Sequence, residues 1–188
     1  LAALRRNTVL DKIIMVITTA FVSMPSFIMG SFLLIVFSVK LGWVPANGAT
    51  AEGLILPIIT LALYPMSYIT RLTRSSMLDV LGQDYIKTAK SKGLSQGKIL
   101  WRHALRNAIM PVVTVMGPTV ASVLTGTFVI ESIFNIPGLG KYFVTSIKDL
   151  DYTMIGGTVV FYGGLLIVCT LVVDLLYGFI DPRVKLEG

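Results

Sequence analysis

Four long apolar stretches constrain the fold of this chain more than any other feature. Residues 13–39, 54–69 and 108–130 carry no charged side chain, and residues 154–180 carry only Asp174. About 20 apolar residues are needed to cross the hydrocarbon core of a bilayer. Because lipid offers the backbone no hydrogen-bond partners, such stretches must be helical. The sequence therefore predicts an all-α membrane protein with spans at about 13–39, 54–72, 108–130 and 154–180.

The charged residues support a membrane location over a soluble fold. They make up 14% of the chain, against about 25% in typical soluble domains. We expect residues 1–188 to form a single transmembrane domain. Because the sequence begins with Leu rather than Met, we also expect one or more further spans to precede it.

The basic residues predict an orientation. With the N-terminus in the cytoplasm, segments 1–12, 71–107 and 181–188 lie inside. Only Lys40, Lys141 and Lys148 of the 16 lysines and arginines then lie outside, as the positive-inside rule requires. We expect the C-terminus to be cytoplasmic as well, and Asp174, near the inner interface, to pair with a basic loop residue. Basic residues placed between spans make nucleic acid a poor candidate partner.

The sequence offers little for catalysis or for metal binding. Cys169 is the only cysteine and His103 the only histidine, so neither a disulfide framework nor a multi-histidine metal site can be built. The phosphate-binding pattern G-x-x-x-x-G-K-[ST] is absent from the sequence. We expect no catalytic residue, no metal and no bound cofactor, and an energy source on another polypeptide.

The inner segment 84–106 has its own helix signals. Asp84 can cap a short helix over 85–92, Gly93 stands where that helix would stop in the left-handed conformation, and Ser95 can cap a second helix. The first helix would gather Tyr85, Ile86 and Ala89 on one side, with Lys87 and Lys90 elsewhere. Its apolar side is suited to a groove on a cytoplasmic partner, but a lysine-rich helix also suits anionic lipid. The residues alone leave both interpretations open.

Two spans carry features typical of either a passage or tight packing. Pro57 and Pro65 can kink the second span. Ser122, Thr125 and Gly126 give the third span a small, partly polar face. We treat these three residues as pathway candidates, although packing is the commoner reason for such a face.

The outer loop 131–153 is too apolar to be merely solvated, and we expect it to fold back onto the bundle. Glu131 sits at the membrane edge, where a carboxylate is tolerable if hydrated or paired, and is a further pathway candidate. Gate candidates in the loop are Phe134, Pro137, Gly138 and Gly140, and the last three belong to a strong turn signal.

Several motifs together resemble a known family. Residues 84–95 read DYIKTAKSKGLS and residues 102–114 read RHALRNAIMPVVT; LGWVP follows the first span and DPR begins at residue 181. This series, which covers nearly the whole chain, resembles the permeases of binding-protein-dependent ABC importers, most closely the first permease subunit of oligopeptide, dipeptide and nickel transporters. Lys87, Thr88 and Ala89 stand where the family's inner loop generally has Glu-Ala-Ala, a departure typical of the peptide branch.

The resemblance implies a type I ABC importer transmembrane domain, of which this chain would supply the last four of six spans. It implies four kinds of partner: a homologous second permease, two ATPase subunits that carry ATP and Mg, a binding protein outside, and the lipid bilayer of a bacterial or archaeal plasma membrane. It also makes 84–94 the coupling helix, with these residues at the ATPase contact: Asp84, Tyr85, Ile86, Lys87, Thr88, Ala89, Lys92, Gly93 and Leu94.

We expect the chain to form half of a translocation pathway for small peptides, and three other functions are alternatives. A nickel chelate is the runner-up substrate of the same mechanism. An ion-coupled secondary transporter would be expected to carry more charge within its spans. A membrane scaffold without transport would leave the patterned inner loop and the folded outer loop unexplained.

Overall fold

The computed structural model describes residues 2–125 and 127–180; for Thr125, Asp174 and residues 176–180 it describes the backbone only. The described residues form helices joined by short turns, which confirms the predicted all-α class. The helices are α1 (Val9–Ser23), α2 (Ser26–Leu33), α3 (Ile55–Leu81), α4 (Asp84–Ser91), α5 (Gln96–Lys98), α6 (Leu105–Ala108), α7 (Met110–Thr125), α8 (Phe128–Ile133), α9 (Leu139–Lys148) and α10 (Tyr152–Ile180). A 3₁₀ turn covers Ala3–Arg5, and π-helical stretches cover Leu34–Lys40 and Ile99–Ala104.

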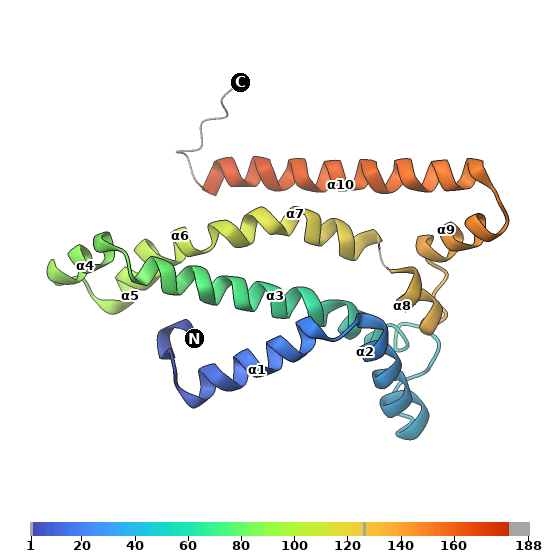
Figure 1. Cartoon of the computed structure of the whole chain (residues 1–188), viewed down its shortest axis with the longest axis horizontal. Helices are drawn as coiled ribbons and strands as arrows, with labels where there is room; N and C mark the ends of the chain where they lie inside the picture. The colour runs from blue at the N-terminus through green and yellow to red at the C-terminus, as the bar shows by residue number, and fades with distance from the viewer. Residues whose placement is uncertain (1, 126, 181–188) are drawn as a thin grey trace.

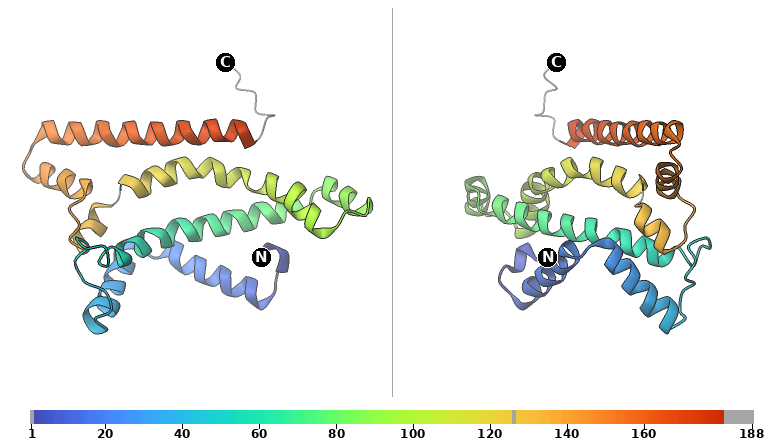
Figure 2. Two further views of the ribbon diagram at one scale, coloured as in Figure 1. Left: turned by 180° about the vertical axis from the view of Figure 1, so that it is seen from behind. Right: turned by 45° about the vertical axis from the view of Figure 1, so that its right-hand side comes forward.

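The four long helices α1, α3, α7 and α10 lie side by side in chain order (Figure 1), and each packs on the next. The N-terminus, α4 and the last turn of α10 lie at one end of the molecule, and α9 and the turn before α3 lie at the other (Figures 1 and 2). The predicted inner and outer segments are thus separated, because α3, α7 and α10 carry the chain between these two ends.

Three helical stretches within the described ranges are long and apolar enough to cross a membrane: Ile55–Leu81, Met110–Ile133 and Tyr152–Val173. The first continues beyond the predicted end at residue 72, because the polar residues that follow still form helix outside an apolar layer. Pro57 lies in its first turn, where no backbone N–H is needed, and Pro65 lies inside it.

The first apolar stretch, 13–39, is not one straight helix. It divides into α1 and the pair formed by α2 and the π-helical stretch, with an angle of 103° between them. The break falls at Met24 and Pro25: proline cannot continue the hydrogen-bond ladder, and it forces the preceding residue out of the helical region. Met24 is accordingly extended, with φ −89° and ψ 124°. The sequence analysis predicted a single span over 13–39 and missed this bend.

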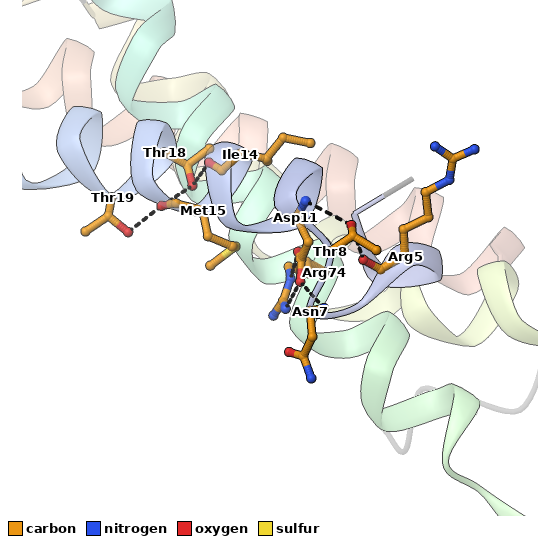
Figure 3. A network of polar contacts seen from close by, with 9 residues as sticks. All are labelled: Arg5, Asn7, Thr8, Asp11, Ile14, Met15, Thr18, Thr19 and Arg74. Carbon is orange, nitrogen blue, oxygen red and sulfur yellow. Dashed lines mark hydrogen bonds and ion pairs between the residues drawn. The ribbon is translucent and has the colours of Figure 1, made fainter.

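A polar network fixes the start of α1 (Figure 3). Thr8 caps the helix by accepting a hydrogen bond from the backbone N–H of Asp11, at 3.4 Å. Asp11 is 2% exposed, and its two carboxylate oxygens each accept a hydrogen bond from Arg74 of α3, at 2.6 Å. Further along, Arg71 donates to the hydroxyl of Thr19 at 2.9 Å. Planar guanidinium-to-carboxylate pairs fix geometry as well as charge, so α1 is held firmly to α3.

The last two long helices approach each other closely at Gly117 of α7. A Cβ added to Gly117 would lie 3.1 Å from the Cα of Thr170 and 3.4 Å from the carbonyl oxygen of Cys169, both on α10. Small residues allow this kind of backbone contact. The opposite side of α10 is open: Val160 is 75% exposed, which is typical of a surface that meets lipid or another subunit.

Candidate functional site

The short helix α4 forms the tip of the molecule at one end (Figure 1), and it ends as predicted. Gly93 has φ +73°, in the left-handed region that favours glycine. Asp84 is not the N-cap: Gln83 holds that position, and Asp84 is the first helical residue. There its carboxylate accepts a hydrogen bond from Lys87 at 2.8 Å. The negative charge also interacts favourably with the positive end of the helix dipole.

The second predicted helix also begins where expected, although it is less regular. Ser95 is the N-cap residue of α5, but its side chain accepts no capping hydrogen bond. The chain then continues through the π-helical stretch Ile99–Ala104 and α6 into α7. The described segment 84–108 is thus a helix, a left-handed stop and a second, irregular helix that leads into the next long one.

The apolar side of α4 faces inward, not toward a partner. Ile86 is completely buried and Ala89 is 6% exposed. They join a cluster that we call the inner seat, which consists of Met77, Ile86, Ala89, Ile99, Ala104 and Ala108. Leu94 packs against its edge. The expectation that this side of the helix docks in a partner's groove is therefore wrong for Ile86 and Ala89, because the chain's own helices already cover them.

Tyr85 connects α4 to the helix that leads into α7. Its hydroxyl accepts a hydrogen bond from the side-chain amide of Asn107 at 2.8 Å, and Asn107 also donates to the carbonyl of His103 at 3.3 Å. Tyr85 is 42% exposed, so it does not lie with Ile86 in the apolar cluster as the sequence suggested. The hydrogen bond and the inner seat together tie the position of α4 to α3 and α6.

The outward side of α4 is polar and accessible. Asp84, Lys87, Thr88, Lys92 and Gly93 are all exposed, and Thr88 already donates its hydroxyl proton to the carbonyl of Asp84 at 3.0 Å. A rigid backing under an exposed, charged face is what a contact surface needs. These side chains can bind a partner or lipid headgroups, but they include no nucleophile paired with a base.

At the opposite end, Glu131 is buried and holds a turn together. It is 8% exposed, and its carboxylate accepts a hydrogen bond from the backbone N–H of Lys141, in the first turn of α9, at 2.9 Å. A carboxylate at a helix N-terminus is favoured by the dipole. Gly138 and Gly140 lie directly against Glu131, because a Cβ on either would approach the carboxylate to 2.6 and 3.0 Å. This environment gives Glu131 a structural role and contradicts its place among the pathway candidates.

The segment that begins at Glu131 folds back onto the bundle, as predicted. Phe134 is completely buried in a cluster with Leu56 and Ile130 that we call the outer seat. The carbonyl of Phe134 accepts a hydrogen bond from the backbone of Gly48 at 2.7 Å. Of the four gate candidates, only Pro137 is exposed. Phe134 is therefore an anchor rather than an accessible gate.

Ser122, one of the pathway candidates, lines a cavity that we call the proline cavity. It has a volume of about 570 Å³ and is lined by Pro25, which follows α1, and by Pro65 and Pro118, which lie inside α3 and α7. The other two candidates in this span, the side chain of Thr125 and residue Gly126, lie outside the described residues. Pro57, in contrast, is buried, so only one of the two prolines in α3 lines a cavity.

Sequence reasoning missed the pair of Asp11 and Arg74. The predicted partner for the inner basic residues was Asp174, whose side chain lies outside the described residues. The available signal was local: Thr8 followed by Asp11 matches the threonine and acid spacing of a helix start. That spacing marks α1, but the contact with Arg74 crosses 63 positions, which no local pattern reveals.

The chain is similar to known proteins along nearly its whole length. Residues 1–186 match the family described as binding-protein-dependent transport system inner membrane component. The chain is 55% identical to a dipeptide transport system permease protein of Bacillus subtilis, with 100% of the chain and 61% of the relative covered.

More distant relatives have similar names. The chain is 42% identical to an oligopeptide transport system permease protein of Haemophilus influenzae and 41% identical to a glutathione transport system permease protein of Escherichia coli. Each alignment covers 98% of the chain and 61% of the relative. The chain thus spans about 61% of the length of the curated relatives that it matches.

Proposed function

Because the chain belongs to the binding-protein-dependent transport system inner membrane components, we propose that it is the C-terminal part of a permease subunit of an ATP-driven peptide importer. In this proposal α4 is the coupling helix. A separate ATPase contacts its exposed face, and ATP with Mg is bound and hydrolysed on that partner.

The observation that carries the coupling role is the difference between the two sides of α4. Ile86 is fully buried in the inner seat, whereas Lys87 and Lys92 on the other side are exposed at the tip of the molecule. A push on the exposed face is transmitted to α3 and α6 because packed interiors resist compression. A helix that served only as a lipid-surface anchor would not need such a rigid backing.

The remaining partners follow from the same proposal. A homologous second permease completes the passage, and a binding protein delivers substrate at the end that holds α9. The transporter lies in the plasma membrane of a bacterium or archaeon, with α4 and both ends of this chain in the cytoplasm. The basic residues favour this orientation, since Lys87, Lys90, Lys92 and Lys98 all belong to the end that holds α4.

We propose small peptides as the substrate. The support comes from the relatives, whose names refer to dipeptides, oligopeptides or glutathione. Nickel chelate, the other substrate that the sequence left open, has no feature of the described residues in its favour. The two substrates are separated by measuring uptake of a labelled dipeptide and of nickel in a strain that lacks the gene. We expect this strain to lose peptide uptake and to retain nickel uptake.

The coupling role is tested at Gly93. A Cβ added to Gly93 would meet nothing within 4 Å, and the same holds for Gly97, but only Gly93 has a positive φ. Gly93→Val therefore strains the backbone by about 1–2 kcal/mol without a steric clash, whereas Gly97→Val adds the same side chain without this strain. In the reconstituted transporter, we expect Gly93→Val to abolish peptide-stimulated ATP hydrolysis and Gly97→Val to retain it.

A third variant sharpens the test. Gly93→Asn restores a residue that tolerates the left-handed conformation, so it should recover part of the stimulation. Membrane insertion of all three variants is checked by their yield in purified membranes. Normal stimulated hydrolysis in an inserted Gly93→Val variant would count against a coupling role for α4.

A further inference from the structure

The proline cavity has features that the coupling role does not use. Pro65 of α3, Pro118 of α7 and Pro25, which lies between α1 and α2, line one hollow of about 570 Å³. Pockets that bind small ligands are typically about 300–1,000 Å³. Pro65 and Pro118 lie inside their helices, where each removes one backbone hydrogen bond, and Pro25 marks the break between α1 and α2. Three prolines that are far apart in the sequence therefore meet at one level of the bundle.

The lining is neutral but rich in hydrogen-bonding groups. None of the residues that line the cavity is charged, and seven carry a hydroxyl: Ser23, Ser26, Thr60, Tyr64, Thr119, Ser122 and Thr127. Thr119 donates its proton to the carbonyl of Val115 at 2.6 Å, which leaves its oxygen oriented as an acceptor. Pro65 also leaves the carbonyl of Leu61 without its usual donor four residues on, and Leu61 lines the cavity.

We propose that the proline cavity recognises the neutral amide groups of a peptide main chain during passage, which deepens the proposed function and rests on it. Backbone N–H and C=O groups carry a strong need for hydrogen bonds, and hydroxyl groups can satisfy both kinds. A lining without charge has no means of selecting acidic or basic side chains. The lining provides hydrogen-bond partners for the main-chain amides that every peptide has, and it does not discriminate between charged side chains.

A second hollow, of similar size, offers fewer hydroxyl groups. It has a volume of about 540 Å³ and is lined by residues 2–4, by α3 and by Trp101. Its charged side chain, Arg74, is already occupied by Asp11, and most of the remaining lining is apolar. Hydroxyls without charge are concentrated at the proline cavity.

The experiment compares two threonines of α7. Thr119 lines the cavity and Thr114 does not, yet both donate to the carbonyl four residues earlier, at 2.6 and 3.1 Å. The full-length subunit in its assembled transporter carries Thr119→Val or Thr114→Val, and uptake of labelled Ala-Ala-Ala is measured in proteoliposomes. We expect the rate at limiting peptide to fall about threefold to tenfold for Thr119→Val, as for one lost hydrogen bond, and to be unchanged for Thr114→Val.

An ester analogue identifies the group on the peptide. Replacing the first of the two amides of Ala-Ala-Ala by an ester removes one N–H donor and leaves the side chains unchanged. The wild-type transporter should take up the amide faster than the ester, and Thr119→Val should reduce this preference. The contribution of the binding protein to the preference cancels, because the binding protein is identical in both measurements. Peptides with a central Lys or Glu should be slowed by Thr119→Val by the same factor as Ala-Ala-Ala.

The outcomes separate this inference from the proposed function. If the wild type takes up no peptide, the proposed substrate is wrong. If the wild type transports peptide while Thr119→Val matches both Thr114→Val and the wild type, the recognition role of the cavity is overturned. Should Thr119→Val fail to assemble, Tyr64→Phe removes a lining hydroxyl at almost constant shape. Its uptake rate then decides in the same way: a fall supports the inference, and an unchanged rate and amide preference overturn it.

Discussion

The helix α4 and the turn before α9 are both anchored by apolar clusters, but the turn is held in addition by a buried carboxylate. In the inner seat, apolar side chains such as Ile86, Met77 and Ile99 fill a core under α4. In the outer segment, Phe134 anchors one side of the turn, and two glycines enclose the carboxylate of Glu131. Apolar contacts are non-directional, whereas hydrogen bonds have a preferred geometry. We infer that α4 is supported by a packed core beneath it, and that the turn before α9 has one fixed shape.

The largest effect is expected where the inner seat loses a buried side chain. Ile86→Ala leaves a cavity at a fully buried position, at a cost of about 3 kcal/mol. Thermal unfolding of the purified transporter in detergent measures the loss. Ile167→Ala, at a residue of α10 that is 69% exposed, should cost much less. Equal destabilisation by both variants would show that the inner seat is not a core.

A smaller effect is expected from Gly140→Ala in the outer segment. The added Cβ would lie 2.9 Å from the backbone of Phe128 and 3.0 Å from a carboxylate oxygen of Glu131, so the turn must shift, at a cost of about 2 kcal/mol. Gly156→Ala is the control, because its Cβ would meet nothing within 4 Å. Unfolding measurements on both variants compare the two sites. A Gly140→Ala variant as stable as Gly156→Ala would mean that the turn adapts.

The smallest effect on stability is expected at the exposed face of α4. Asp84 and Lys87 form an ion pair whose side chains are 94% and 68% exposed, so Lys87→Ala should change stability by less than about 0.5 kcal/mol. Peptide-stimulated ATP hydrolysis should nevertheless fall, because the lost charge belongs to the proposed contact face. Lys148→Ala, at the opposite end, removes a charge without this consequence. A fall in stability that matches the loss of stimulation would assign Lys87 to the fold instead.

The long apolar stretches predicted helices in four places, of which the first is bent at Pro25, and local signals predicted several helix ends. Gly93 was identified as a left-handed stop because few other residues tolerate that conformation, and α7 begins at Met110, near the predicted start of the third span at 108. The roles of Ile86 and Glu131 were not predictable. An apolar face looks the same in sequence whether it packs on its own chain or on another. A carboxylate at a membrane edge does not reveal which backbone N–H will reach it.

The sequence by itself determined the helical class, the long helices that separate segments 84–106 and 131–153, and the stop at Gly93. These depend on the length of apolar runs and on the backbone freedom of single residues. Tertiary structure alone decided that Asp11 meets Arg74, that α4 turns Ile86 inward, and that Pro25, Pro65 and Pro118 share one cavity. Each of these features joins positions far apart in the chain, and their meeting depends on how whole helices pack.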